Sequence, residues 1–436
     1  MKKKKRISST ALIAWFLFVV LFLSAWNADR FVDMMASELP GITPENAKVR
    51  TDRWDSYYTR YFRFMEPLAE LTGASFLVMG KKSADNYNYF KDGAGCMQLL
   101  EDDFDRPRAE KQIQTLAGAF EGRGVPFIFV AMPPRFDKED FPVARELDFF
   151  GQHDEKMIAA LSGGGIDVLD AGQLMKDSGA RYLYPFKTDI HLETEGEFET
   201  ARLLAEKLSS MGLEIMGRDS VFDKGSYEIV PYAFTGNLVK SYGVSYTFGG
   251  DIFELWYPLF DTDLTVTNPG LPILGPDIAA ADLSLPIADP DGAAADPGLP
   301  IADPDIAVTD PDLATTNPDD VVSKQGPFAE SVMNGMELRG SANPYWVINY
   351  LQYPSPYYTI VNNNNKDGCK LLFIIDSYAM RTVAYLSLGA GRIDVIDTRS
   401  DGSAEYLRQA METGGYDAVL VAAGGKDFYN SIDIGQ

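Results

Sequence analysis

Short apolar runs alternate with amphipathic helical stretches along most of the 436-residue chain, and this alternation restricts the fold more than any other feature. The runs are typical of buried strands, because they are rich in Val, Ile and Phe and end at Gly, Pro or Asp. Strands separated by helices favour a mainly parallel α/β sheet, since a parallel connection needs a helix-length crossover. We expect strands at 75–80, 125–134, 166–171, 369–376, 392–399 and 416–425, with helices at 108–124 and 404–415.

The N-terminus has the pattern of a membrane anchor. Five basic residues at 2–6 precede an uncharged apolar run at 11–26, which reaches about 20 residues when Ile7 is included and so matches the length of a bilayer-spanning helix. The positive-inside bias places residues 1–6 in the cytoplasm and the rest of the chain outside. We therefore expect a signal-anchor at 7–26 and a juxtamembrane helical region at 27–74. A cleaved signal peptide is the alternative, although "LSAWNAD" offers no small-x-small cleavage site.

Residues 261–320 differ from the rest of the chain. This segment contains 13 Asp, no Lys, Arg or Glu, and two copies of "LPIADPD". Regular Pro and Asp disfavour helices and sheet ladders, so we expect a solvated, extended insert. A calcium-binding repeat is the alternative, but neither the EF-hand pattern nor the Gly-Asp spacing of calcium β-rolls is present.

The charge and the scarce Cys and His exclude several classes of function. The formal charge is -24, of which the insert supplies 13 negative charges and the remainder 11, so nucleic acid is not an expected partner. Two cysteines, Cys96 and Cys369, are compatible with a disulfide or with two buried thiols. The only histidines, His153 and His191, show no zinc spacing, and we expect neither a metal nor a cofactor.

Ser377 follows the apolar run of 369–376 and precedes a helical stretch, in "LLFIIDSYAM". A serine at such a strand-to-helix turn lies at the edge of the sheet, where helix N-terminal amides carry positive partial charge. It can act as a nucleophile, with its own amide or that of Tyr378 holding an oxyanion. The alternative is an ordinary N-cap serine.

His191 lies just before the "TEGE" segment, in which Thr194 and Glu197 predict a capping box. Asp189, two residues earlier, is placed to accept a hydrogen bond from the imidazole Nδ1, which leaves Nε2 to take a proton from a serine. A surface histidine beside a surface aspartate is the alternative. His153 has no such neighbours, and we expect it to be solvated.

Two segments resemble those of a known family. "YLYPFKTDIHLETEGEFETARLLAEKL" resembles the TD-x-H segment of the SGNH-hydrolase-like proteins of alginate O-acetylation and of the related DHHW proteins, and "CKLLFIIDSYAMRTVAYLSLGAGRIDVIDTR" resembles their nucleophile block. Weaker similarities such as "GRGVPFIFVAMPPRFDK" and "FTGNLVKSYG" follow in family order over roughly 75–425. The resemblance implies a flavodoxin-like SGNH domain at 75–436, with the motifs in permuted order and the acidic insert within it.

The resemblance also implies a Ser377, His191 and Asp189 triad, with Gly236 and Asn237 as further oxyanion or substrate contacts, although a tight turn explains these two equally well. Two positions depart from the family pattern, because Ile375 replaces the usual Gly before Asp-Ser and Leu192 replaces the usual Trp after His. The second change removes a surface on which a sugar could stack.

The implied activity is transfer or removal of O-acetyl groups on a cell-envelope or secreted polysaccharide through an acyl-enzyme. The implied partners are the polysaccharide acceptor and a membrane O-acyltransferase that delivers the acetyl group. The alternative is a non-catalytic polysaccharide-binding or accessory module, for which the 12% aromatic content would supply stacking surfaces.

The anchor makes one testable prediction. Full-length protein should stay with the membrane fraction after a carbonate wash and keep its original N-terminus, because a 20-residue apolar helix does not leave the bilayer at high pH. N-terminal sequencing and fractionation measure both properties. A mature N-terminus near Asn27 in the soluble fraction would instead establish cleavage.

Overall fold

The computed structural model describes residues 65–84, 89–93, 95–99, 106–133, 155–178, 186–239, 242–268, 322–333, 357–398, 400 and 402–422. The expected anchor at 7–26 and His153 lie outside these residues. Among the helices that are described, none has the length and apolarity needed to cross a membrane. The chain divides into two compact units, of which the second begins at Phe76 and contains most of the described elements.

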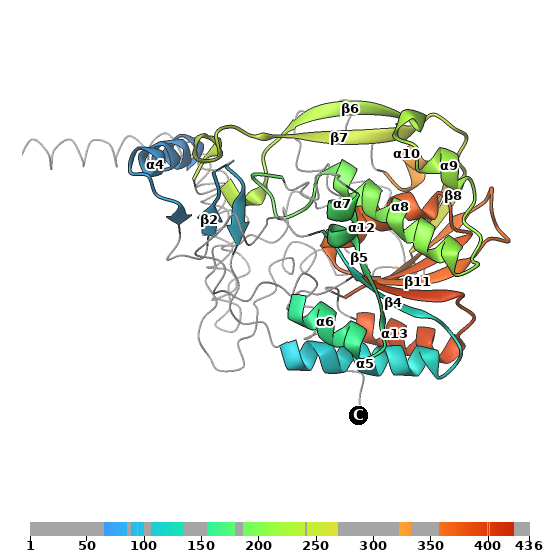
Figure 1. Cartoon of the computed structure of the whole chain (residues 1–436). Helices are drawn as coiled ribbons and strands as arrows, with labels where there is room; N and C mark the ends of the chain where they lie inside the picture. Colours follow the sequence, from blue (N-terminus) through green and yellow to red (C-terminus); the bar gives the residue numbers. More distant parts are fainter. Residues whose placement is uncertain are drawn as a thin grey trace, which may run out of the picture. The chain divides into compact units, whose positions relative to one another are not determined.

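An eight-stranded sheet forms the centre of the second unit (Figure 1). Its strand order is β5-β4-β13-β11-β12-β10-β8-β9, and every pair from β5 to β12 is parallel, whereas the three remaining pairs are antiparallel. The strands are β4 (Phe127–Ala131), β5 (Asp167–Asp170), β8 (Leu264–Asn268), β9 (Val322–Gly326), β10 (Tyr357–Asn362), β11 (Lys370–Ile375), β12 (Arg392–Asp397) and β13 (Ala418–Ala422). The predicted mainly parallel α/β sheet is confirmed.

The order of the parallel strands is that of a permuted flavodoxin-like sheet. Counted from β11, the strand that precedes Ser377, the strands β12-β11-β13-β4-β5 follow the flavodoxin-like order 2-1-3-4-5. In this chain, however, the last two strands of that order come first in the sequence. The segment that contains Ser377 therefore lies beside the centre of the sheet although its residues come late in the sequence.

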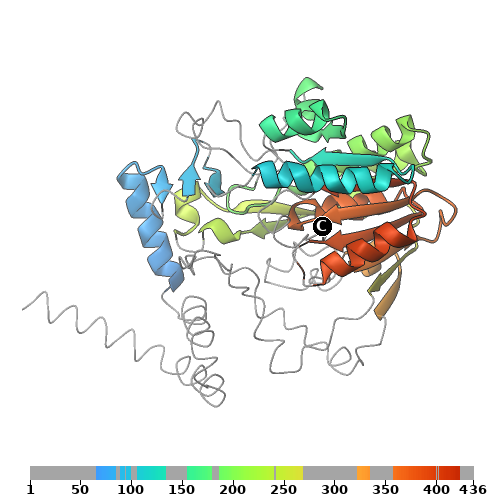
Figure 2. The same cartoon turned by 90° about the horizontal axis from the view of Figure 1, so that it is seen from below.

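Helices cover both faces of the sheet (Figures 1 and 2). Alternate residues of β11 point to opposite sides, so that Leu371, Phe373 and Ile375 join one core cluster and Leu372 and Ile374 the other. Elements of the first cluster include α7 (Ala171–Asp177), α8 (Thr194–Ser210), α9 (Arg218–Val221), α10 (Phe328–Ser331) and α12 (Met380–Ser387). Helices of the second cluster are α5 (Arg106–Glu121), α6 (Glu155–Gly163) and α13 (Ser403–Thr413). Because both faces are covered, the central strands contain continuous apolar runs.

Smaller elements surround the sheet. The hairpin of β6 (Tyr227–Phe234) and β7 (Asp251–Pro258) packs over the side that carries α8. A three-stranded sheet is formed by β1 (Ser83–Ala84), β2 (Tyr89–Lys91) and β3 (Met97–Leu99). Short 3-10 turns occur at η6 (Lys224–Ser226), η7 (Asn237–Val239), η8 (Val244–Thr247) and η11 (Ser377–Ala379).

The strand predicted at 75–80 is wrong. These residues continue α4 (Met65–Val78), which ends where Gly80 adopts a φ of 65°. The amides of Gly80 and Lys81 donate to the carbonyls of Leu77 and Phe76, as in a glycine-terminated helix end. A short apolar run does not distinguish a strand from a helix end, and here the preceding residues are helical.

The predicted start of the acidic insert is also wrong. Residues 264–268 form β8, in which Leu264 and Val266 are buried against the core, and β8 pairs with both β10 and β9. Thr-Val-Thr alternation within this strand is a β pattern that the surrounding Asp residues obscured. The segment between β8 and β9 lies outside the described residues.

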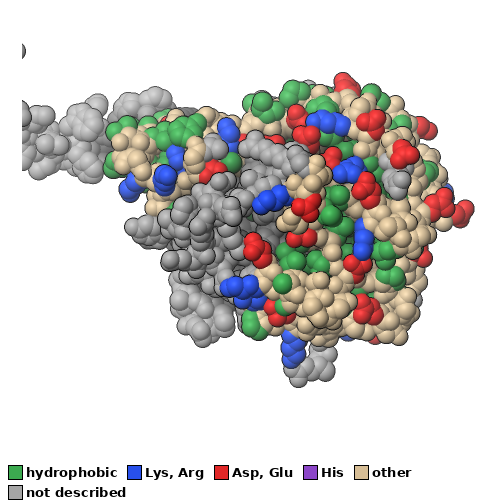
Figure 3. All heavy atoms as spheres, viewed as in Figure 1, with side chains coloured by type: hydrophobic (Ala, Val, Ile, Leu, Met, Phe, Trp, Pro, Cys, Tyr) green, Lys and Arg blue, Asp and Glu red, His purple; other side chains and the backbone are tan. Residues whose placement is uncertain are grey.

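The described surface carries side chains of both charges, and both cysteines are free thiols. On the face shown in Figure 3, both Lys or Arg and Asp or Glu side chains are spread over the larger part of the described surface. Cys96 and Cys369 are both free thiols, so they do not form a disulfide here. Burial raises the pKa of the Cys369 thiol to about 11.

The pairing of β8 with β9 yields a prediction for the insert. Asn268 lies opposite Val322 in this antiparallel ladder, so a Gly/Ser turn of about four residues can replace 269–321. The melting temperature should change by only a few degrees, because loop-closure entropy varies slowly with length. As a control, replacing 261–321 removes β8 with its buried Leu264 and should lower the melting temperature by roughly 10 °C or more. A comparable loss in both variants would contradict the assigned boundary.

Candidate active site

Ser377 lies directly beyond the carboxyl end of β11, at the start of the 3-10 turn that leads into α12. The cap of this turn is Asp376, whose carboxylate accepts a hydrogen bond from the Tyr378 amide at 2.8 Å. Thr398 donates its amide and its hydroxyl to the Ile375 carbonyl, at 2.9 and 3.1 Å, and so fixes the end of the strand. Since Asp376 is the cap, the alternative of Ser377 as an N-cap residue is not supported.

The hydroxyl of Ser377 is not used to hold the turn. Its side chain is partly exposed, and within the described part of the chain neither its hydroxyl nor its amide makes a hydrogen bond. A hydroxyl placed at the carboxyl end of a parallel strand, next to helix-start amides, is in a suitable position to attack an electrophile.

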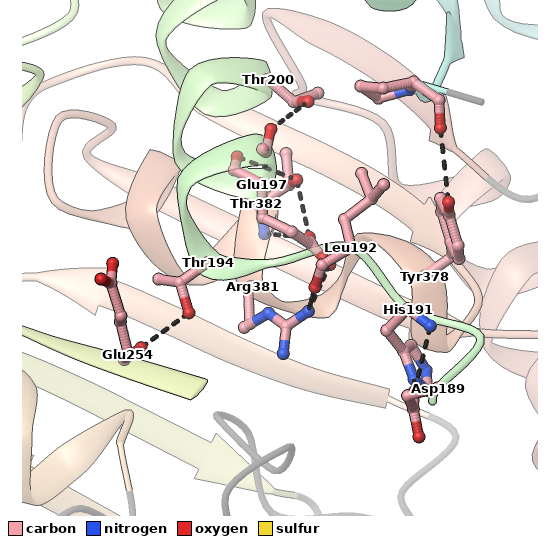
Figure 4. Close-up of polar contacts among 12 residues, drawn as sticks. Asp189, His191, Leu192, Thr194, Glu197, Thr200, Glu254, Tyr378, Arg381 and Thr382 are labelled. Carbon is pink, nitrogen blue, oxygen red and sulfur yellow. Dashed lines mark hydrogen bonds and ion pairs between the residues drawn. The ribbon is translucent and has the colours of Figure 1, made fainter. Parts of the chain in front are cut away.

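Asp189 and His191 form a buried pair (Figure 4). The Asp189 Oδ1 lies 2.6 Å from the His191 Nδ1 and accepts the His191 backbone amide at 3.0 Å. Asp189 is 1% exposed and His191 is 9% exposed, so water does not compete strongly for this contact. An imidazole that donates Nδ1–H to a carboxylate presents Nε2 as an acceptor. The Nε2 atom is buried and has no hydrogen-bond partner among the described residues.

Tyr378 links the turn that contains Ser377 to this pair. Its ring stacks on the His191 imidazole with 6.3 Å between the ring centroids and 25° between the planes. Its hydroxyl donates to the Pro133 carbonyl, just past the carboxyl end of β4, at 3.3 Å. The residue that follows Ser377 is therefore packed against the imidazole.

A buried carboxylate that sequence reasoning missed holds the loop of Asp189. Asp251, the first residue of β7, accepts the backbone amides of Lys187 and Thr188 at 2.9 and 2.8 Å and also the Thr188 hydroxyl. The Thr188 hydroxyl oxygen in turn accepts the Gly236 amide at 2.8 Å. These contacts join residues 63 and 48 positions apart in the sequence, so no local pattern could have indicated them.

Gly236 supports this loop and has no space for a side chain. A Cβ atom there would lie 2.3 Å from the Asp189 Cβ and 2.3 Å from the Thr188 carbonyl oxygen. Because its amide donates to Thr188, a role for Gly236 as an oxyanion donor is not supported. The same holds for the Tyr378 amide, which donates to Asp376. Asn237 begins the 3-10 turn η7. Of the predicted oxyanion donors, the amides of Gly236 and Tyr378 are therefore occupied, whereas the Ser377 amide makes no hydrogen bond among the described residues.

The predicted capping box of Thr194 and Glu197 is wrong. The N-cap of α8 is Glu193, which makes no side-chain cap, and the Thr194 hydroxyl donates to the Glu254 carbonyl at 2.7 Å. The Glu197 carboxylate points away from its own helix end and contacts Arg381 and Thr382 of α12. Burial raises the pKa of Glu197, while the charges of Arg381 and His191 and hydrogen bonds from Thr382 oppose this rise.

The two departures from the family pattern do not change a substrate-facing surface. Ile375 and Leu192 are both fully buried in the first core cluster. A residue at position 192 therefore packs inside the protein, and the expectation that Leu192 removes a sugar-stacking surface is wrong.

The arrangement has the components of acyl-transfer chemistry. An imidazole Nε2 acceptor, oriented by a buried carboxylate, lies next to the turn that carries an unengaged serine hydroxyl. Such a base can remove the hydroxyl proton as the oxygen attacks a carbonyl carbon.

The fold is similar to those of several solved structures. A structure of Bacillus cereus PatB1 with a sulfonyl adduct matches with a TM-score of 0.52 at 13% sequence identity, covering 79% of this chain and 97% of that one. A second structure of Bacillus cereus PatB1 gives a TM-score of 0.50 at 14% identity, with 78% and 98% covered. A DHHW family protein from Eubacterium siraeum covers 77% of this chain and 92% of its own, at 14% identity and a TM-score of 0.48.

No protein-family model matches the chain, and no curated protein does. At this level of identity the likeness concerns the fold. The resemblance to SGNH-like proteins that the sequence indicated is confirmed at that level.

The contact between Gly236 and Asp189 can be tested directly. Gly236→Ala should lower the free energy of unfolding by about 1–3 kcal/mol, because the new methyl group must displace the Asp189 loop. Displacing the imidazole by roughly 1 Å should also reduce turnover of an acetyl ester about 10²-fold. Thermal unfolding and ester hydrolysis measure the two effects.

Gly118→Ala is the matched control, since Gly118 lies on an exposed part of α5 with no atom within 4 Å of an added Cβ. It should be neutral or stabilising by up to about 1 kcal/mol. Wild-type stability and turnover in Gly236→Ala would show that the Asp189 loop does not depend on this contact.

Proposed function

We propose that this protein is an extracytoplasmic, membrane-anchored carbohydrate O-acetyltransferase or O-acetylesterase that uses Ser377 as nucleophile, His191 as general base and Asp189 as the group that orients the imidazole. The observation that carries the proposal is the buried Asp189–His191 pair, whose Nε2 is left as an acceptor beside the residue that follows Ser377. The fold likeness to PatB1, whose structure is known with a sulfonyl adduct, supports a nucleophilic site on this fold.

The first half-reaction forms an acetyl-enzyme. The Ser377 Oγ attacks the acetyl carbonyl carbon while the His191 Nε2 takes the hydroxyl proton. The carbonyl π electrons move to oxygen, and the Ser377 amide donates a hydrogen bond to the oxyanion. When the tetrahedral intermediate collapses, the bond to the donor oxygen breaks, and the imidazolium returns its proton to that leaving oxygen.

The second half-reaction returns the enzyme to its starting state. A sugar hydroxyl attacks the acetyl-serine carbonyl and gives its proton to the His191 Nε2, and collapse releases the Ser377 oxygen, which takes the proton back. Water in place of the sugar gives hydrolysis by the same steps. During both steps the Asp189 carboxylate stabilises the imidazolium and keeps the Nδ1 proton in place.

The substrates follow from the same proposal. The acceptor is a hydroxyl group of a cell-envelope or secreted polysaccharide, and the acetyl donor is supplied by a membrane O-acyltransferase. The anchor at 7–26 would keep the site next to that enzyme. A non-catalytic polysaccharide-binding or accessory module is the alternative function.

Substitution of the three residues tests the proposal. With full-length protein in detergent and a chromogenic acetyl ester, Ser377→Ala and His191→Ala should each reduce turnover on the order of 10⁴-fold or more. The double variant should lose little more, because members of such a unit do not act additively. Asp189→Asn should cost about 10³–10⁴-fold, since it favours the wrong imidazole tautomer.

His153→Ala is the control for a histidine that the proposal leaves outside the site, and it should keep wild-type turnover. Full turnover in His191→Ala, or absence of turnover in the wild type, would reject the enzyme proposal and favour the binding module.

A further inference from the structure

Helices α8 and α12, which follow His191 and Ser377, contact each other through charged side chains at their first turns. Helix α8 begins three residues after His191, and α12 begins three residues after Ser377. Glu197 projects from the first turn of α8, and Arg381 is the second residue of α12. Figure 4 shows both side chains in the space between the two helices.

Glu197 binds the start of the nucleophile helix. Its Oε2 accepts the Thr382 amide and the Thr382 hydroxyl, both at 3.0 Å, and its Oε1 accepts Arg381 Nη2 at 3.1 Å. A carboxylate on a first-turn amide supplies the cap that α12 lacks, because its N-cap residue Ala379 has no side chain that can accept. The helix after Ser377 is therefore capped by a side chain from the helix after His191.

Arg381 binds the loop of the base in return. Its Nη2 also donates to the carbonyl of Leu192, the residue that follows His191. Its guanidinium lies 5.8 Å from the Phe186 ring and 5.4 Å from the Phe253 ring. The Phe186 amide donates to the His191 carbonyl at 3.3 Å, so the loop that carries the imidazole is held on both sides.

The ion pair between Glu197 and Arg381 has a defined hydrogen-bond geometry, and its burial has a free-energy cost. The side chains of Arg381 and Glu197 are 2% and 1% exposed, and the desolvation of two charges offsets much of their attraction. Nε and Nη1 of Arg381 have no hydrogen-bond partner among the described residues, which lowers the stabilisation further. A buried pair of this kind is weak evidence for stability, but its hydrogen bonds fix the geometry of the groups that it joins.

We infer that Glu197 and Arg381 are positioning residues, which form a reciprocal clasp that sets the distance between the His191 imidazole and the Ser377 hydroxyl. The inference rests on the proposed function, because it assigns the clasp to the same Ser377–His191 site. No other described ion pair joins α8 to α12, and the clasp acts on the two segments that carry the reacting groups.

Replacing both Glu197 and Arg381 by apolar residues separates their effect on turnover from their effect on stability. In the double variant Glu197→Met with Arg381→Met, apolar side chains of similar length fill the space without leaving a buried unpaired charge. The Thr382 amide and the Leu192 carbonyl lose their partners, so the melting temperature should fall by several degrees while the protein still folds. Turnover of the chromogenic acetyl ester should fall on the order of 10²-fold with KM changed by less than about 2-fold, since only the alignment of the reacting groups is lost.

A second measurement reports on the serine alone. The rate at which a sulfonyl fluoride modifies Ser377, followed by mass spectrometry, should fall in parallel with kcat. Arg381→Lys keeps the positive charge but not the planar guanidinium with its several donors. This variant should fold like the wild type, and its kcat and its labelling rate should each fall about 10-fold. This variant decides the question if the double variant does not fold.

The matched control removes another ion pair from the same helix. Lys207 at the far end of α8 binds Asp167 of β5 at 2.7 Å, with side chains that are 28% and 43% exposed. Lys207→Met with Asp167→Asn should leave kcat and the labelling rate at wild-type values, because this pair contacts neither the base loop nor α12.

The outcomes distinguish the clasp from the proposed function. Wild-type kcat and labelling in both Glu197→Met/Arg381→Met and Arg381→Lys would overturn the clasp and leave the enzyme proposal intact. A wild-type protein that neither turns over the ester nor becomes labelled at Ser377 would overturn both. Loss of kcat in the Lys207/Asp167 control as well would also overturn the clasp, since any ion pair on α8 would then have the same effect.

Discussion

The position of β11 at the centre of the sheet is the constraint on which the rest of the structure depends. This strand pairs in parallel with β12 and β13, and five of its six residues are buried. Its apolar side chains contribute to both core clusters, so its carboxyl end cannot shift without disturbing both faces. Ser377 therefore takes its place from the packing of the whole sheet.

The Asp189–His191 loop is held at that edge by contacts with residues that are distant in the sequence. The Asp251 carboxylate holds the backbone of the loop that carries Asp189, and Gly236 packs directly on that loop. Arg381 contacts the same loop from α12. The site is thus assembled from the end of β11, the loop before α8 and the β6–β7 hairpin, and each contributes a part that the others cannot supply.

The sequence predicted the elements that follow from local pattern. Short apolar runs located β4, β5, β11, β12 and β13 to within a few residues, because a strand covered on both faces needs such a run. The spacing of Asp189 and His191 correctly indicated their contact, since a carboxylate two residues back can reach Nδ1. Local pattern failed where tertiary partners decide the outcome. The Glu197 carboxylate binds the buried Arg381 instead of capping its own helix. The strand β8 was not predicted, because the neighbouring Asp and Pro residues indicated an extended insert.

The central claim is that Ser377 carries the acetyl group, and its most direct test is to observe the acyl-enzyme. Full-length protein would be mixed with excess acetyl ester, quenched in acid within the first turnover, digested and mapped by mass spectrometry. The account predicts the mass increase of one acetyl group on the peptide that contains Ser377, and no such increase in the Ser377→Ala variant treated in the same way. An acetyl group on a different residue, or an unmodified Ser377 peptide while ester turnover continues, would contradict it.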